Sequence, residues 1–145
     1  MGGVKIITKN KRAYHDYEIL DTYEAGIVLT GTEIKSIRLA KVSINDAYCH
    51  IKNGEMILIN MHIAKYDKGT LFNHEETRNR VLLLHSSEIR KLEMKVKLAG
   101  LTIVPLEVYL KRGLAKVVIG LARGKNLHDK RKQLKEEELK RSERL

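Results

Sequence analysis

The chain has 145 residues, of which 43% are hydrophobic and only 5% aromatic, and its net charge at pH 7 is +10. A single cysteine, Cys49, excludes an intramolecular disulfide, and no window approaches the roughly 20 apolar residues of a membrane span. Residues 1–30 show no secretory signal, so we expect a cytoplasmic protein with no membrane partner.

The charge distribution divides the chain into a body of residues 1–122 and a tail of residues 123–145. The body has 19 Lys and Arg against 13 Asp and Glu, and the tail has nine against five, with four leucines and no aromatic residue. The body is long enough to bury one core, whereas the tail is too polar to build its own. Because both parts are basic, nucleic acid is the favoured partner, with solubility as the alternative reason for the charge.

Residues 17–29 alternate between apolar and polar side chains, which predicts a half-buried strand with Glu24 on its outer face. Thr30 and Glu33 have the spacing of a capping box. A short helix is therefore expected next, with Lys35 and Arg38 pointing outward.

A β-hairpin is predicted over residues 47–63, because Asn53-Gly54 separates two alternating runs. The side chains expected on the core side are Ala47, Cys49, Ile51, Ile57, Ile59, Met61 and Ile63. The polar positions between them place Tyr48, His50 and Lys52 on the outer face.

Residues 65–80 lack periodicity and predict a long mobile loop, with Lys65, Lys68, Arg78 and Arg80 at its rim. A brief apolar strand is expected over residues 81–84, with Leu83 as a core residue. A helix should follow, capped by Ser86 or Ser87 and stopped at Gly100. Its apolar positions at 3-4-3 spacing are Ile89, Leu92, Val96 and Ala99.

The last element of the body is a second hairpin, which turns at residues 111–113. One face of its first strand is expected to carry Val104, Leu106, Val108 and Leu110, and one face of its second strand Ala115, Val117, Ile119 and Leu121. Lys116 would lie opposite, and Pro105 predicts an edge or bulged strand. Five or six antiparallel strands with two or three short helices predict a mainly β fold, a closed barrel of the oligonucleotide-binding (OB) type.

No spacing in the sequence suits a metal site or a catalytic motif. The six histidines form no metal-ligating pair, and His74-Glu75-Glu76 does not continue to the second histidine of a zinc protease, since residue 78 is Arg. A nucleophile elbow and a phosphate-binding loop are both absent, and Cys49 is expected on the core side. We predict no enzyme activity, no metal and no cofactor.

The outward residues of the strands form the candidate interface, although a solvated sheet face is the alternative explanation. They are Glu24, Tyr48, His50, Lys52 and Lys116. The scarcity of aromatic residues favours folded RNA, recognised through phosphates and 2′-hydroxyls, over stacked single strands. A carboxylate such as Glu24 would accept a hydrogen bond from a base edge or a 2′-hydroxyl.

In the tail, Leu127, Leu134 and Leu145 share a narrow stripe of a helical wheel. The pairs Glu136/Lys140 and Glu137/Arg141 are each worth roughly 0.2–0.5 kcal/mol. That is less than the ordering cost of about 1–2 kcal/mol per residue. We expect the tail to be disordered when free and helical when bound, with a solubility tail as the alternative.

Seven separated motifs occur in the order in which one known family carries them. They are residues 10–17 (NKRAYHDY), 23–27 (YEAGI), 31–38 (GTEIKSIR), 52–55 (KNGE), 82–85 (LLLH), 121–125 (LARGK) and 128–131 (HDKR). The chain thereby resembles, from about Lys9 to its end, the family of SsrA-binding proteins (small protein B), the bacterial partners of transfer-messenger RNA.

The resemblance implies an RNA-binding adaptor that grips the tRNA-like domain of transfer-messenger RNA (tmRNA) and delivers it to stalled ribosomes for trans-translation, with no DNA partner. The RNA-binding positions that it implies are Glu24, Leu83, Lys116, Lys11, Arg12, His15, Lys35 and Arg38. It also implies a tail that contacts the decoding centre and the mRNA channel of the small subunit. The tail residues concerned are Gly124, Lys125, His128, Asp129, Lys130, Arg131, Lys135, Lys140 and Arg141.

Among the departures from the family pattern, three positions lack a lysine that is usual there: Asn126, Val81 and Ser87. Each departure removes a positive charge that could contact phosphate. Two other classes of protein fit a small basic chain. One is an OB-fold ribosomal or initiation-factor-like protein that binds structured rRNA, and the other is an RNA-modifying enzyme or nuclease.

Overall fold

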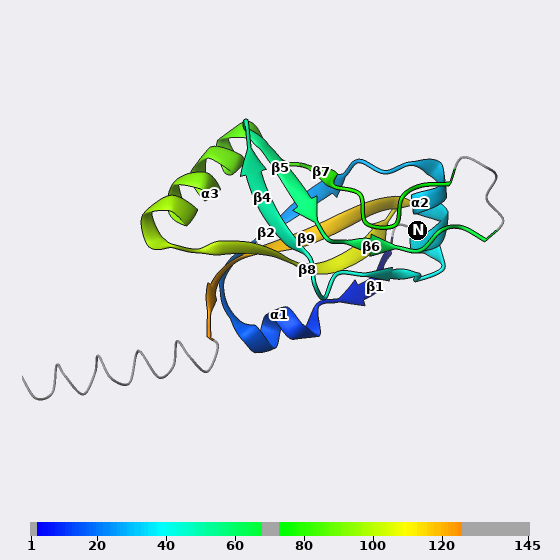
Figure 1. The fold of residues 1–145 in the computed structure, drawn as a ribbon, viewed down its shortest axis with the longest axis horizontal. Coiled ribbons are helices and arrows are strands. Elements are labelled where there is room, and N and C mark those ends of the chain that lie inside the picture. Colours follow the sequence, from blue (N-terminus) through cyan, green and yellow to red (C-terminus); the bar gives the residue numbers. More distant parts are fainter. Residues whose placement is uncertain (1–2, 68–72, 126–145) are drawn as a thin grey trace, which may run out of the picture.

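The computed structural model describes residues 3–67 and 73–125, and antiparallel strands are its main secondary structure (Figure 1). The elements in chain order are β1 (Val4–Lys9), α1 (Lys11–Asp16), β2 (Tyr17–Ile27), α2 (Gly31–Arg38), β3 (Val42–Ser43), β4 (Tyr48–Lys52), β5 (Glu55–Ile59), β6 (His62–Ile63), β7 (Arg80–Leu83), α3 (Ser86–Ala99), β8 (Thr102–Lys111) and β9 (Leu114–Gly124). The expected disorder and helix of the tail, and the expected mobility of residues 68–72, lie outside the described residues.

Six strands close into a ring. The sheet runs in the order β8-β4-β5-β7-β2-β9, and β9 pairs again with β8. Strand β1 lies outside this ring, on the edge of β8, while β3 and β6 form a separate two-stranded sheet. The predicted closed, mainly β, antiparallel fold is confirmed. Strands β1 and β3 and helix α1 were not predicted as elements, and β6 was predicted only as the end of the second strand of the hairpin over residues 47–63.

Pro105 predicted either an edge strand or a bulged strand. Strand β8 is bulged, as the second alternative predicted, but it lies inside the sheet and not at its edge. The register shifts between Pro105 and Glu107, which leaves Leu106 without a partner on β9. Because a bulge reverses the alternation, Val104 and Leu106 pack in a small cluster with Ala13 and Ala122. Val108 instead lies in the main core. The prediction that these apolar residues share one face of the strand is therefore wrong.

The predicted hairpin of β4 and β5 is confirmed, but the core face assigned to β5 is wrong. Its two-residue turn, Asn53-Gly54, has positive φ at both positions, and it pairs Cys49 with Leu58 and Ile51 with Met56. Met56 and Leu58 are therefore the buried residues, while Ile57 and Ile59 lie opposite His50 and Tyr48 on the outer face. A further positive φ at Asn60 precedes Met61 and Ile63, which are buried as predicted.

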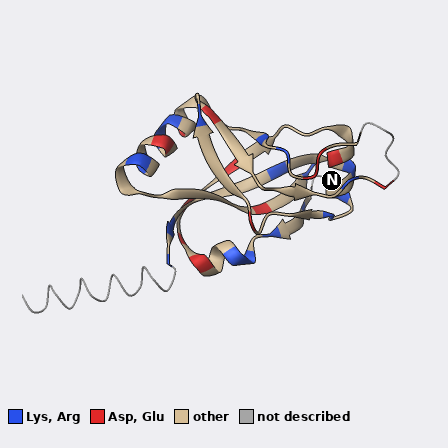
Figure 2. Cartoon of the chain, in the orientation of Figure 1, with Lys and Arg blue, Asp and Glu red and all other residues tan. Residues whose placement is uncertain are grey.

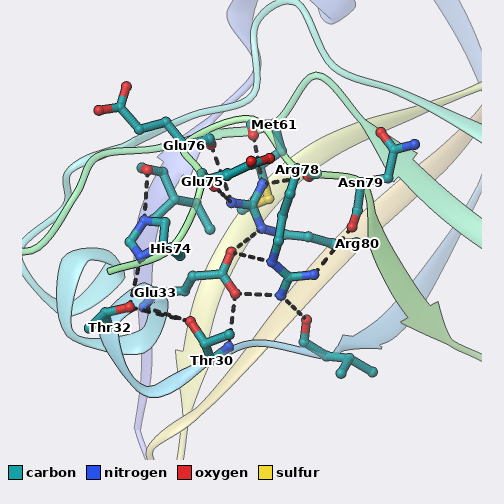
Figure 3. Close-up of polar contacts among 12 residues, drawn as sticks. Thr30, Thr32, Glu33, Met61, His74, Glu75, Glu76, Arg78, Asn79 and Arg80 are labelled. Atoms are coloured by element: carbon teal, nitrogen blue, oxygen red, sulfur yellow. Dashed lines mark hydrogen bonds and ion pairs between the residues drawn. The ribbon is translucent and has the colours of Figure 1, made fainter. Parts of the chain in front are cut away.

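A buried carboxylate organises the connection between β6 and β7 (Figure 3). Glu33 completes the predicted capping box of α2 by accepting a hydrogen bond from the Thr30 N–H, at 2.8 Å. It also pairs with the guanidinium groups of Arg78 and Arg80. Arg80 is fully buried, and Arg78 is half-buried. The prediction that both arginines rim a loop is therefore wrong for Arg80, which is buried in β7, whereas Arg78 does lie in the non-repetitive segment before β7.

Arg80 is satisfied by five hydrogen bonds. Its Nε donates to Glu33, and its terminal nitrogens donate to the carbonyl groups of Met61, Arg78, Glu75 and Glu76. Since a buried cation without partners would be strongly disfavoured, these bonds fix the course of the chain around it. Arg80 is also the first residue of β7, so the same contacts hold this strand against α2.

His74 provides a second attachment of this segment. Its Nε2 hydrogen-bonds the Ile63 carbonyl at 2.9 Å, and its Nδ1 lies 2.8 Å from the Thr32 hydroxyl of α2. The side chain is buried. The non-repetitive residues 73–79 are thereby joined to both β6 and α2.

Helix α3 starts one residue earlier than expected. His85 is its N-cap residue, and the His85 N–H donates to the Glu88 carboxylate at 3.2 Å, so the expected Ser86 or Ser87 cap is wrong. Gly100 closes the helix at φ 63°, as predicted. Ile89 and Leu92 are buried and Val96 is partly buried, but Ala99 is exposed.

We expect Arg80→Met to destabilise the fold by about 3–5 kcal/mol, because it leaves the charge of Glu33 buried with one partner fewer. The measurement is the free energy of unfolding in urea at neutral pH. Arg90→Met, at an exposed position of α3, is the matched control and should change stability by less than about 0.5 kcal/mol. Equal effects of the two substitutions would show that the buried pair carries no special role.

We expect stability to fall in acid. Burial raises the pKa of Glu33, but hydrogen bonds from Arg78, Thr30 and Arg80 lower it by more, to below its ordinary value of 4.5. A depressed pKa stabilises the folded state above the unfolded pKa, and this stabilisation is lost as the pH falls through the folded value. Urea unfolding at several pH values between 7 and 3 should show the decline. In Glu33→Gln it should start from a lower stability and be shallower.

Candidate nucleic-acid interface

Three of the predicted site residues meet in one hollow on the outside of the sheet. Glu24 comes from β2, Leu83 from β7 and Lys116 from β9, and the hollow has a volume of about 550 Å³. Its other lining residues are Gly26, Leu84, His85 and Glu88. Residues that lie far apart in the sequence are therefore brought to one place by the closure of the sheet.

The register of the strands explains why these side chains share a face. Gly26 pairs with Leu83 on one side and with Lys116 on the other. Because directly paired residues of neighbouring strands point to the same side of a sheet, Leu83 and Lys116 flank Gly26 on the outer face. Glu24 lies two residues before Gly26 and so points the same way.

The side chain of Leu83 lies next to Gly26. A Cβ atom at position 26 would lie 3.4 Å from Leu83 Cβ and 3.6 Å from Leu83 Cδ1. Leu83 is nevertheless 58% exposed. The interpretation of Leu83 as a core residue, from the apolar run in the sequence, is wrong, because Leu82 takes the core position and Leu83 faces outward.

The two charged groups of the hollow, Glu24 and Lys116, are not joined in an ion pair within the described residues. Among the ion pairs of the described residues, neither Glu24 nor Lys116 takes part in one. A carboxylate offers acceptors to hydroxyl or amino groups, and an ammonium group offers donors to phosphate. The hollow therefore presents an acceptor, a cation and an apolar side chain together.

Tyr109 of β8 adjoins the hollow and was not singled out by the sequence. It pairs directly with Lys116 across the strands. Burial raises its pKa to about 12, and the carboxylate of Glu24 adds to the shift. The sequence could have indicated it, because Tyr109 lies between Val108 and Leu110, which were predicted on the core face, and so its ring belongs to the outer face. His85 and Glu88 carried no such signal, because they line the hollow only through the start of α3.

Helix α1 brings a second set of predicted residues close to the end of β9. Lys11, Arg12 and His15 lie on α1 and are exposed. Arg12 pairs with Asp46 at 2.7 Å and with Asp16 at 3.6 Å, and His15 Nδ1 lies 2.9 Å from Asp16. Arg12 and His15 are thus partly engaged with acidic neighbours. Lys11 forms no ion pair within the described residues.

The start of the predicted tail is part of the sheet. Gly124 pairs with Tyr17 of β2, and the Lys125 N–H donates to the Asp16 carbonyl at 2.7 Å. The chain therefore leaves the body beside α1. The remaining predicted tail contacts lie outside the described residues; they are His128, Asp129, Lys130, Arg131, Lys135, Lys140 and Arg141.

Lys35 and Arg38 lie on α2 and are exposed, as predicted. Helices α2 and α3 occupy opposite ends of the long axis in Figure 1. The Lys35 ammonium lies 5.5 Å from the ring centre of Tyr66, within the range of a cation–π contact. Basic residues occur on all three helices, so the predicted cations do not form one patch (Figure 2).

The outward residues of β4 belong to a different surface from Glu24 and Lys116. Tyr48 and His50 line a separate hollow of about 660 Å³, together with Glu93 and Lys97 of α3. Lys52 is exposed at the end of the same strand. The five outward residues of the sequence pattern are therefore divided between two faces of the molecule.

The part of the chain that the structure describes contains neither a candidate metal site nor a helix that could cross a membrane. No group of three or more His, Cys, Asp or Glu side chains is placed to hold a metal ion. In the same residues, no helix combines the length and the apolar character that crossing a membrane requires. Cys49 is buried, which raises the pKa of its thiol.

Comparison with known proteins gives one consistent family. A family model described as SmpB protein matches residues 7–144. The SsrA-binding protein of Bacillus cytotoxicus is 54% identical over 140 residues, covering 97% of this chain and 90% of the relative. That of Ligilactobacillus salivarius is 52% identical over 135 residues, covering 93% and 87%. A solved structure described as "tmRNA-SmpB: a journey to the center of the bacterial ribosome" has a TM-score of 0.70 and 51% identity, covering 85% of this chain and 86% of the other.

Proposed function

Because this chain belongs to the SmpB protein family, we propose that it is an RNA-binding adaptor that binds transfer-messenger RNA and delivers it to the ribosome. Its relatives are SsrA-binding proteins, and the similar solved structure is of tmRNA-SmpB on the bacterial ribosome. The work of such an adaptor is binding, without a chemical step of its own. Its place of action is the cytoplasm, where the ribosomes are.

The observation that carries the proposal at the level of residues is the hollow of Glu24, Leu83 and Lys116. These residues lie on three strands and are 59 and 33 positions apart in sequence, yet they line one cavity. Sequence similarity alone would be compatible with scattered positions. Their convergence supports a single contact area for the tRNA-like domain of transfer-messenger RNA.

The chemistry of the hollow suits folded RNA. Lys116 would contact a phosphate, Glu24 would accept a hydrogen bond from a 2′-hydroxyl or a base amino group, and Leu83 would pack against a base or ribose. A carboxylate repels phosphate, so its presence beside a lysine orients the RNA backbone to one side of the hollow. This arrangement distinguishes a specific contact from general attraction to a basic protein.

The tail and α1 would form a second contact area, directed at the ribosome. Gly124 and Lys125 leave the body beside Lys11, Arg12 and His15. The sequence after Lys125 holds seven Lys and Arg residues against five Asp and Glu residues. We propose that residues from Gly124 onward contact the decoding centre and the mRNA channel, while the hollow stays on the RNA that is delivered.

Lys116→Gln should weaken binding of the tRNA-like domain and reduce its salt dependence. Loss of one phosphate contact lowers the slope of log affinity against log salt by about 0.7–0.9 in magnitude. Affinities measured at several salt concentrations test this. Lys52→Gln is the matched control, since Lys52 is an exposed strand lysine on the other surface and should leave the slope unchanged. Equal slopes for Lys116→Gln and the unchanged protein would reject the hollow as the phosphate contact.

Truncation after Lys125 should separate the two contact areas. The shortened protein retains every residue of the hollow and of the sheet, so it should bind the tRNA-like domain with unchanged affinity. It should fail to support tagging of proteins on stalled ribosomes. Binding assays and a tagging reaction, each with the full chain as control, give the two readouts. A parallel loss in both would contradict the division of roles.

A further inference from the structure

The row of residues that crosses the hollow continues beyond it. Leu83 of β7, Gly26 of β2, Lys116 of β9, Tyr109 of β8 and Ile6 of β1 are paired in succession across five strands. Directly paired residues share one side of a sheet. Tyr109 therefore points to the same outer face as Lys116, away from the core to which Val108 belongs.

The burial of Tyr109 is unusual for this position. A side chain on the outer face of a sheet is normally exposed, as Ile6 and Leu83 are, at 50% and 58%. Tyr109 is only 6% exposed. Its ring must therefore lie against the outside of the sheet and be covered by neighbouring side chains.

Glu24 is the group that a tyrosine in this orientation can reach. Glu24 pairs with Val118, which follows Lys116 by two residues on β9. Tyr109 and Glu24 thus lie on either side of β9, on two strands separated by about 10 Å. A tyrosine and a glutamate side chain that extend toward each other span such a distance. Glu24 also contributes to the raised pKa of Tyr109, both as a hydrogen-bond acceptor and through its charge.

We propose that Tyr109 is a positioning residue for RNA binding, whose hydroxyl donates a hydrogen bond to Glu24 and holds this carboxylate apart from Lys116. The inference rests on the proposed function of the hollow. A carboxylate and an ammonium group that line one hollow attract each other, and an ion pair between them would cancel both as contacts for RNA. The donor on Tyr109 competes for the carboxylate, so the hollow keeps a free acceptor and a free cation.

The protonation state of Tyr109 suits this role. A raised pKa means that the hydroxyl keeps its proton throughout the neutral range and acts as a donor. The covered ring has little freedom to turn away. Glu24, which lines the hollow, is therefore held by a rigid neighbour.

The experiment measures the affinity of the full-length protein for the tRNA-like domain in four variants: Tyr109→Phe, Glu24→Gln, the double variant, and Tyr23→Phe. Tyr109→Phe keeps the ring and removes only the hydroxyl, and we expect binding to weaken by about 3- to 10-fold, the range of one hydrogen bond. If Tyr109 acts through Glu24, the double variant should bind no more weakly than Glu24→Gln alone. Fully additive losses, or unchanged binding by Tyr109→Phe, would overturn the proposal.

Tyr23→Phe is the matched control. The Tyr23 hydroxyl also donates to a carboxylate, that of Asp21, at 3.0 Å. This pair belongs to the same strand as Glu24 but does not line the hollow. Its removal should leave RNA affinity unchanged, and an equal loss in both tyrosine variants would contradict a specific role of Tyr109.

Salt dependence separates positioning from a merely structural role. In Tyr109→Phe the carboxylate can pair with Lys116, so the slope of log affinity against log salt should fall by about 0.7–0.9 in magnitude. Glu24→Gln cannot neutralise the lysine and should keep the slope. An unchanged slope in Tyr109→Phe would count against the proposal. If the unchanged protein itself fails to bind the tRNA-like domain, the proposed function fails; if it binds and the variants behave additively, only the role of Tyr109 is rejected.

Discussion

The buried ion pair of Glu33 with Arg80 is the interaction on which the arrangement of the molecule depends. Both side chains are fully buried. A charge that is removed from water must find its counterion and its hydrogen bonds within the protein. Glu33 meets this requirement from the first turn of α2, and Arg80 meets it from the first residue of β7. These two elements, together with the segment that joins β6 to β7, can therefore adopt only the arrangement that satisfies both groups.

The RNA-contacting hollow inherits its geometry from this constraint. Leu83 lies three residues after Arg80 on the same short strand, and it pairs with Gly26 of β2. Fixing the start of β7 against α2 thus fixes the residue that flanks Glu24 and Lys116. A hollow built on three paired strands of a closed sheet is also rigid, because none of its strands can shift without breaking its neighbours' hydrogen bonds. Such rigidity suits recognition of folded RNA, in which the positions of phosphates and hydroxyls are themselves fixed.

The position of a carboxylate within a basic protein makes recognition selective. Positive charge on the helices attracts any polyanion, and it acts over several ångströms without reading its shape. Glu24 has the opposite effect on RNA, since its carboxylate repels phosphate and binds only hydroxyl or amino groups, which can donate a hydrogen bond. With Tyr109 in the proposed role, the acceptor is kept available beside Lys116. General attraction would then come from the surface, and discrimination from one small area of the sheet.

The sequence by itself determined the identity of most elements. The capping box of Thr30 and Glu33, the turn at Asn53-Gly54, the stop at Gly100 and the alternation from Ala115 to Leu121 are local patterns, and each reappears in the structure. Glu24 and Lys116 were placed on the outer face by the same reasoning. Local chemistry sufficed for these features, because a cap, a turn or an alternation depends on residues a few positions apart.

Tertiary structure alone decided which face apolar runs present and which charges are buried. Met56 to Ile59 are all apolar, so the core side of β5 depends on its pairing with Cys49 and Ile51. Leu82 and Leu83 are chemically identical, and only the pairing of β7 with β2 turns Leu83 outward. Arg80 resembled a loop cation, because its partner Glu33 lies 47 residues away. Burial, register and ion pairing are properties of distant residues brought together, and the closure of the sheet is the physical event that brings them together.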